Sequence, residues 1–164
     1  MCFKLFSNEM IGQPSLDGYV AYVRKQVGEV VRYETTWGAV KAELEGSGLE
    51  CMIGDNVADA AVFYPDEESL LKMLPYLTFP ADYYVAQLSI DCDDYSMWAA
   101  ALARMIFNVN GIYQCWGDMP LGYHGFSLGY WPGKYRLWEP NAGFAYAGEL
   151  FESGEYDYLP MKWK

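Results

Sequence analysis

The spacing of apolar and polar residues predicts helices in the first half of the chain and strands in the last third. Helical periodicity covers 15–28, 36–46 and 66–75, and each of these stretches begins with Ser, Thr or Asp and ends at Gly or Pro. Residues 30–33 read as a short extended segment. After Gly111 the chain is rich in Tyr, Trp, Phe and turn residues, which is typical of strands.

A further helix is predicted near the middle of the chain. Asp91 is a good N-cap, and Asp94 stands three residues on, where its carboxylate can complete a capping box. This places Cys92 at the first helical position. The predicted apolar stripe consists of Trp98, Leu102, Met105 and Ile106, and Asn110-Gly111 is expected to end the helix.

Two of the later strands should form an antiparallel hairpin. They span 123–130 and 135–139 and are separated by turn residues that include Pro and Gly. In the register that this turn sets, His124 falls opposite Asn141, and Glu139 lies diagonally on the same face. Either polar side chain could therefore orient the histidine ring.

The length of 164 residues suits one domain, and we expect an α+β fold. Its parts would be a mainly helical 1–80, a central helix within 81–110 and an antiparallel sheet over 111–164. No apolar run is long enough to cross a bilayer, and the first residues do not resemble a secretory signal. These features predict a cytoplasmic protein.

The net charge of −11 argues against nucleic acid as a partner, because phosphate backbones are bound by clustered Lys and Arg. Clustered carboxylates could instead gather a hard cation, or simply aid solubility. The four cysteines are far apart and form no C-x-x-C pair, so we expect thiols and neither a disulfide scaffold nor a zinc site. Nothing in the sequence indicates an organic cofactor.

Cys92 is the candidate nucleophile. A thiol at a helix N-terminus lies beside unsatisfied N–H groups and the positive end of the helix dipole, which favour the thiolate. His124 is the only histidine in the chain, so any mechanism that uses imidazole must use this one. A cysteine, a histidine base and a polar group that fixes the base form the general arrangement of an activated thiol.

Short motifs around these residues carry a resemblance to a known family. The stretch D-C-D-D-Y-S at 91–96 resembles the signature of transglutaminase-like cysteine peptidases of bacteria and phages. Residues 122–126 and 137–141 look like the later part of that signature, as found in relatives of the C-terminal peptidase domain of fungal agglutinins. The resemblance covers about 83–144.

The resemblance implies a papain-like fold and hydrolysis or transfer of an amide bond in a peptide or peptidoglycan-like substrate. Cys92 would be the nucleophile, His124 the base and Glu139 the orienting residue. Papain-like enzymes that use an amide in the third place would favour Asn141 instead. They also have a Gln before the nucleophile, and Gln87 could supply this oxyanion donor.

The resemblance also implies calcium, for which there is a physical reason. Asp91, Asp93 and Asp94 surround the thiol with negative charge, which raises its pKa. A bound dication would reverse this rise. We therefore expect some of these three carboxylates, together with ligands from elsewhere in the chain, to bind calcium, with the rival interpretation that they only cap the helix.

The sequence is also compared with the patterns of four other functions. The main rival is a non-catalytic acidic binding protein, such as an intracellular partner or a DNA mimic. Residues 125–129 match G-x-S-x-G, but no helix and no histidine follow Ser127. The chain lacks the histidines of a zinc hydrolase. A glycoside hydrolase would need paired carboxylates, whose separation the sequence does not give.

Overall fold

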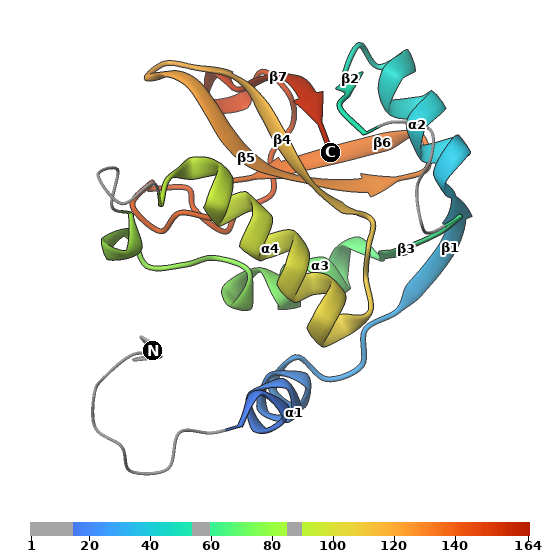
Figure 1. The fold of residues 1–164 in the computed structure, drawn as a ribbon, viewed down its shortest axis with the longest axis vertical. Coiled ribbons are helices and arrows are strands. Elements are labelled where there is room, and N and C mark those ends of the chain that lie inside the picture. Colours follow the sequence, from blue (N-terminus) through green and yellow to red (C-terminus); the bar gives the residue numbers. More distant parts are fainter. Residues whose placement is uncertain (1–14, 54–59, 85–89) are drawn as a thin grey trace.

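The computed structural model describes residues 15–53, 60–84 and 90–164. Its helices and strands follow one another in the order shown in Figure 1. They are α1 (Leu16–Val27), β1 (Arg32–Thr36), α2 (Trp37–Gly46), β2 (Glu50–Cys51), β3 (Ala61–Pro65), α3 (Glu67–Met73), α4 (Cys92–Phe107), β4 (Ile112–Met119), β5 (Gly122–Trp131), β6 (Lys134–Trp138) and β7 (Leu159–Trp163), with short 3₁₀ turns η1 (Leu74–Tyr76), η2 (Ala81–Tyr83) and η4 (Glu155–Asp157). In this described part of the chain, no helix is both long enough and apolar enough to cross a bilayer.

The strands form two sheets. The larger sheet has the order β2-β7-β4-β5-β6, in which β2 runs parallel to β7 and the other neighbours are antiparallel. The smaller sheet pairs β1 with β3 in antiparallel register. The protein is therefore α+β with a mixed main sheet.

This topology corrects the predicted arrangement of a helical N-terminal part followed by a purely antiparallel C-terminal sheet. The N-terminal part contributes three strands, β1, β2 and β3, and one of them joins the main sheet. A two-residue strand such as β2 carries no periodicity of its own. It is defined by its partner β7, more than a hundred residues away, so local pattern could not reveal it.

The three earlier helices lie where their caps predicted them. The side chains of Ser15, Thr36 and Asp66 each accept a hydrogen bond from a backbone N–H in the first turn of α1, α2 and α3. Figure 1 shows α1 beside the last turns of α4, and α2 beside β2 at the other side of the molecule. These predictions are confirmed.

Helix α4 packs on β4 and β5 and is the scaffold of the candidate site. Its buried face includes Tyr95, Ala99, Ala103 and Ile106, whereas Met105 is exposed, so the predicted stripe was partly wrong. The small alanines let the helix approach the strands closely. The helix also ends earlier than predicted, because Asn108 adopts the left-handed conformation that stops it (φ 57°).

The predicted hairpin is confirmed as β5 and β6. Ser127 pairs with Trp138, and Leu128 pairs with Leu137. The ladder ends at the Ser127–Trp138 pair, so the predicted pairing of Asn141 with His124 is not formed, and Asn141 makes a parallel bridge with Phe79 instead.

Gly117 allows the close pairing of β4 with β7. The register shifts there, and a Cβ built on Gly117 would lie 2.0 Å from the carbonyl oxygen of Leu159. We expect Gly117→Ala to lower the free energy of unfolding by about 1–3 kcal/mol, because the strands must separate to admit the methyl group. Urea unfolding measures the change. Gly38→Ala is the control, since a Cβ there meets nothing within 4 Å. An equally small change in the free energy of unfolding in both variants would contradict the close pairing of β4 with β7 at Gly117.

Candidate functional site

Cys92 stands at the start of α4, where the chain meets β5. Asp91 is the N-cap, and the carboxylate of Asp94 accepts from the Asp91 N–H at 3.0 Å, which completes the predicted capping box. The Cys92 sulfur accepts a hydrogen bond from the N–H of Gly125 at 3.2 Å. The thiol is free and partly buried, like that of Cys51, whereas the free thiol of Cys115 is buried.

Gly125 is what allows β5 to approach this helix start. A Cβ at Gly125 would lie 3.0 Å from the Asp93 Cα and 3.1 Å from the Asp93 N, both of them backbone atoms that do not move independently of the helix. An isolated glycine in a strand indicates close backbone approach, so Gly125 is the one local signal in the sequence that points to this contact.

His124 lies on β5 one residue before Gly125, and its ring is held from two sides. Its Nε2 is 2.7 Å from Oε2 of Glu139. Cys92 is a near neighbour of the ring, and its sulfur helps to raise the pKa of the imidazole. The imidazole is 11% exposed, and the Phe144 ring lies 5.4 Å away between centroids. The structure therefore brings together all three residues that the sequence singled out, Cys92, His124 and Glu139.

Glu139 is completely buried and each of its oxygens is satisfied. Oε1 accepts from the backbone N–H of Asn141 at 2.9 Å, and Oε2 accepts from the hydroxyl of Tyr158 at 2.9 Å as well as contacting His124. The hydroxyl of Tyr146 donates in turn to that of Tyr158 at 3.2 Å. A buried carboxylate with this many donors keeps a fixed orientation, which fixes the histidine ring.

Tyr158 was missed by the sequence analysis. It is fully buried beside Glu139, and burial together with that neighbouring carboxylate raises the pKa of its phenol well above the ordinary value. Tyr158 lies between η4 and β7, far from the motifs, and no local pattern distinguishes it from the other fourteen tyrosines.

The surroundings of His124 favour its protonated form. Burial lowers the pKa of the imidazole, but the hydrogen bonds to Cys92 and Glu139 and their negative charges outweigh it and raise the pKa to about 9. An imidazolium held beside a cysteine sulfur is the arrangement that activates thiol nucleophiles.

This raised pKa predicts that the protein loses stability in alkaline solution. The ordinary histidine value of 6.5 applies to the unfolded chain, so the stabilisation is complete below pH 6.5 and is lost as the pH rises through about 9. We expect the free energy of unfolding in urea to fall by on the order of 1–3 kcal/mol between pH 6 and pH 9. His124→Gln should remove most of this difference. A free energy of unfolding that rises between pH 6 and pH 9 would contradict the ion pair of His124 with Glu139.

A cavity of about 350 Å³ opens beside the thiol. This volume is in the range of small-molecule sites. Its walls carry mainly aromatic and apolar side chains around Cys92 and His124. The lining residues are Tyr84, Cys92, Met119, Leu121, Gly122, Tyr123, His124, Asn141 and Phe144.

Two other candidates from the sequence have different outcomes. The side chain of Asn141 lines the cavity, but its Oδ1 accepts from the N–H of Gly143 at 2.9 Å, and it is Glu139 that contacts the histidine. Gln87, the predicted oxyanion donor, lies outside the described residues. Its role stays a prediction.

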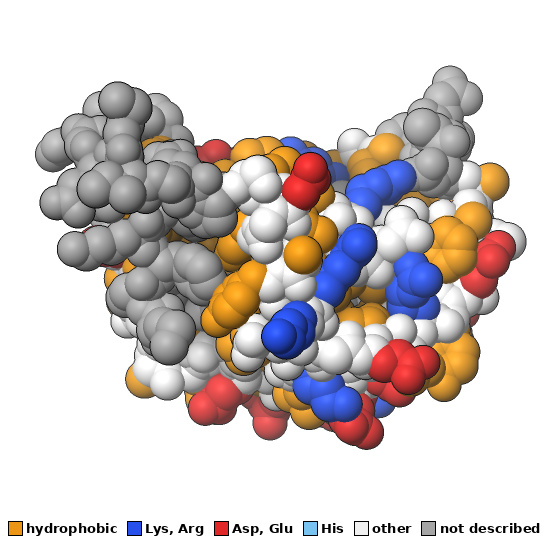
Figure 2. All heavy atoms as spheres, turned by 90° about the horizontal axis from the view of Figure 1, so that it is seen from below, with side chains coloured by type: hydrophobic (Ala, Val, Ile, Leu, Met, Phe, Trp, Pro, Cys, Tyr) orange, Lys and Arg blue, Asp and Glu red, His pale blue; other side chains and the backbone are white. Residues whose placement is uncertain are grey.

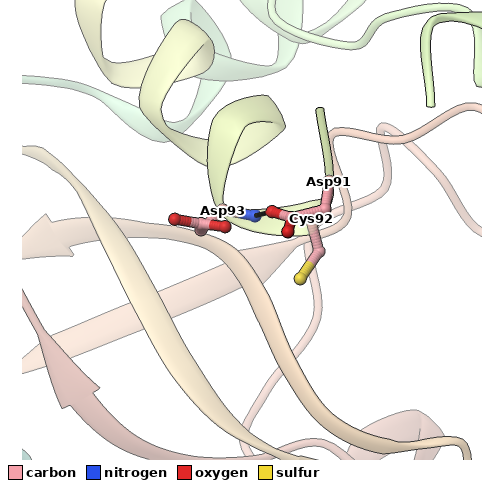
Figure 3. Close-up of side chains that lie close together, drawn as sticks. All are labelled: Asp91, Cys92 and Asp93. Carbon is pink, nitrogen blue, oxygen red and sulfur yellow. Dashed lines mark hydrogen bonds between the residues drawn. The ribbon is translucent and has the colours of Figure 1, made fainter. Parts of the chain in front are cut away.

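The carboxylates around the thiol act as helix caps. Figure 3 shows Asp91, Cys92 and Asp93 at the start of α4, with the sulfur pointing away from the Asp93 carboxylate. Oδ1 of Asp91 accepts from the Asp93 N–H at 3.3 Å. A hydrogen bond with Asp91, burial and the nearby negative charge raise the pKa of the Asp93 carboxyl.

Calcium suits this donor set poorly. Among the described residues, one group of potential ligand atoms lies here within 4.8 Å of one another, and it comprises Asp91, Cys92 and Asp93 without Asp94. Calcium takes about six to eight oxygen ligands, whereas this group offers two carboxylates and a sulfur. Calcium binding by the three aspartates therefore stays a prediction, which calorimetry with CaCl₂ can test.

Comparison with known proteins gives no family for the chain. No family model and no curated protein matches it. A solved structure described as "PSL1a-E64 complex" is similar, with a TM-score of 0.53 and 16% identity over 79% of this chain and 50% of that one. The crystal structure of Polyporus squamosus lectin bound to the human-type influenza-binding epitope Neu5Aca2-6Galb1-4GlcNAc gives a TM-score of 0.52 and 15% identity over 79% and 49%. The chain spans about half the length of these neighbours.

These comparisons contradict the predicted family. The similar structures include a lectin, and no family model supports a papain-like or transglutaminase-like cysteine peptidase. Three predictions are therefore wrong: the papain-like fold, the amide hydrolase or transferase activity, and the peptide or peptidoglycan-like substrate. The physical reason is that the motifs are short: they determine a helix cap, a thiol position and a strand end, but not the rest of the fold or the ligand.

Proposed function

We propose that the chain is a ligand-binding protein whose cavity holds a reactive thiol, Cys92, which forms a covalent bond with an electrophilic ligand. The observation that carries the proposal is a buried His124–Glu139 pair, 2.7 Å between Nε2 and Oε2, whose histidine lines the same cavity as the cysteine at a helix N-terminus. Ligand capture is the whole of the proposal, and amide hydrolysis forms no part of it.

The bonds that change can be stated for an epoxide. Sγ of Cys92 attacks a ring carbon, a C–S bond forms and the C–O bond of the ring breaks. The His124 imidazolium gives its proton to the released oxygen, and Glu139 keeps the ring oriented during the transfer. The N–H of Gly125, 3.2 Å from the sulfur, helps to hold the thiolate in place before attack.

E64 is a suitable probe, because it carries an epoxide and is named in the description of one structural neighbour. We expect intact-mass spectrometry to show one adduct per chain, and peptide mapping to place it on Cys92. Cys92→Ser should give no adduct. Cys115 serves as an internal control, since burial raises the pKa of its thiol well above the ordinary value. Slow and equal labelling of Cys51 and Cys92 would contradict the proposal and favour a binder without a reactive thiol.

Carbohydrate binding is a second candidate. It is favoured by the sialylated trisaccharide in the description of the other neighbour and by aromatic rings at the cavity, Tyr84, Tyr123 and Phe144. Tyr123 is 58% exposed and could stack on a sugar ring. Titration of Neu5Aca2-6Galb1-4GlcNAc followed by ¹⁵N NMR tests this. Shifts confined to the cavity residues and reduced in Tyr123→Ala support it, and an unchanged spectrum contradicts it.

A further inference from the structure

A second hollow lies at the other end of α4 from the thiol. The helix has 16 residues, so its ends are about 24 Å apart. The hollow has a volume of about 480 Å³, and three arginines line it: Arg24 on α1, Arg32 on β1 and Arg104 on α4. Figure 2 shows Lys and Arg side chains gathered on the face that carries this end of the molecule. The reactive cavity and this basic hollow are separate sites.

Two of the guanidinium groups are held in place by the end of the helix. Nε of Arg24 donates to the carbonyl oxygen of Ile106. Nη1 of Arg32 donates to the carbonyl oxygens of Phe107 and Asn108, at 3.4 and 3.3 Å. A guanidinium has about five N–H donors, so each group keeps donors that these bonds do not use.

The arginines at the hollow bring more positive charge than the helix end requires. The C-terminus of a helix carries about half a negative charge, whereas the guanidinium groups of Arg24 and Arg32 alone carry two positive charges. Among the described ion pairs, none joins a carboxylate to Arg24 or Arg32. This concentration occurs in a chain whose net charge is −11 and whose Lys and Arg total 11. Capping alone does not account for it.

We propose that this hollow binds a phosphate group. The planar guanidinium presents parallel N–H donors that match the oxygens of phosphate, and the carbonyl contacts arrange two such groups in advance. The volume also admits a small molecule that bears the phosphate, and Val30 and Phe107 offer apolar wall beside the arginines. The proposal does not depend on the reactivity of Cys92.

Titrations with inorganic phosphate and phenyl phosphate, followed by ¹⁵N NMR of backbone and Arg Nε–H signals, test the site. We expect saturable shifts at Arg24, Arg32 and Arg104. Phenyl phosphate binding at least tenfold tighter than inorganic phosphate indicates a phosphate ester as the ligand, and equal binding indicates free phosphate.

Variants separate the site from general charge effects. Arg32→Gln and Arg104→Gln should each weaken phosphate binding at least tenfold, and since both side chains are exposed the core should stay folded. Arg136→Gln is the matched control. Arg136 lies on β6, pairs with Glu152 and does not line the hollow, so this variant should bind phosphate like the wild type. Cys92→Ser should also bind normally. Absence of saturable binding, or equal weakening in all three arginine variants, would overturn the proposal.

Discussion

Replacing His124 with Ala should slow the alkylation of Cys92 by about 100-fold or more at pH 6. The imidazolium is the group that stabilises the attacking sulfur and donates the proton, and positioned proton transfer of this kind contributes roughly 10²–10⁴ in rate. Because the surroundings raise the pKa of His124 to about 9, the ring carries its proton at pH 6. Mass spectrometry of quenched samples gives the rate of adduct formation with E64.

Cys51 provides the reference for this experiment within the same molecule. It is partly buried like Cys92, but it lies on β2, outside the cavity. Its labelling rate should be the same with and without His124. If Cys92 reacts equally fast in the wild type and in His124→Ala, the histidine plays no part in activating the thiol.

Removing the Glu139 side chain should cause the largest loss of stability. Glu139→Ala leaves a buried imidazolium without its carboxylate and leaves the Tyr158 hydroxyl and the Asn141 N–H without their acceptor. Breaking a buried ion pair costs about 3–5 kcal/mol. Urea unfolding at pH 6 measures the loss, and Glu139→Gln, which keeps the shape and one amide acceptor, should lose less.

Glu152→Gln is the matched control for this prediction. Glu152 also pairs with a cationic side chain, Arg136 at 2.8 Å, but its side chain is 63% exposed. Surface pairs of this kind contribute about 0–1 kcal/mol. A loss in Glu139→Ala no greater than in the control would show that the buried network does not hold the site together.

The sequence was informative wherever a local signal determines local structure. Ser15, Thr36, Asp66 and Asp91 cap helices because their side chains satisfy the first backbone N–H groups, which depends only on residues nearby. The hairpin register followed from its turn in the same way. These two signals place Cys92 at a helix start and His124 on a hairpin strand.

Features that depend on distant contacts were not predictable. Strand β2 has two residues and exists through its pairing with β7, and Tyr158 reaches Glu139 from the end of the chain. Helix α4 ends at Asn108 and not at the predicted Asn110-Gly111, because asparagine also tolerates the left-handed conformation. The Asn-Gly pair is the more familiar stop signal, so the prediction chose it. In each case the local sequence is compatible with more than one structure, and contacts with distant residues determine which one forms.

The family prediction failed for a related reason. A cysteine at a helix start, a histidine on a strand and a carboxylate at a strand end need little sequence to specify, so the motifs describe a small arrangement and carry no information about the ligand. The similar solved structures, one of them a lectin, match 79% of the chain at 15–16% identity, which is a likeness in fold alone. The chemistry of the site must therefore be measured directly.

The most direct measurement is an NMR titration of the single histidine. In protein labelled with ¹⁵N-histidine, the ring nitrogens of His124 report its protonation without overlap from any other residue. We predict a midpoint near pH 9 in the wild type and a lower midpoint in Cys92→Ser, because the hydrogen bond and charge of Cys92 help to raise the pKa. A midpoint at or below 6.5 that is unchanged by Cys92→Ser would contradict the linked thiol, imidazole and carboxylate on which the proposed function rests.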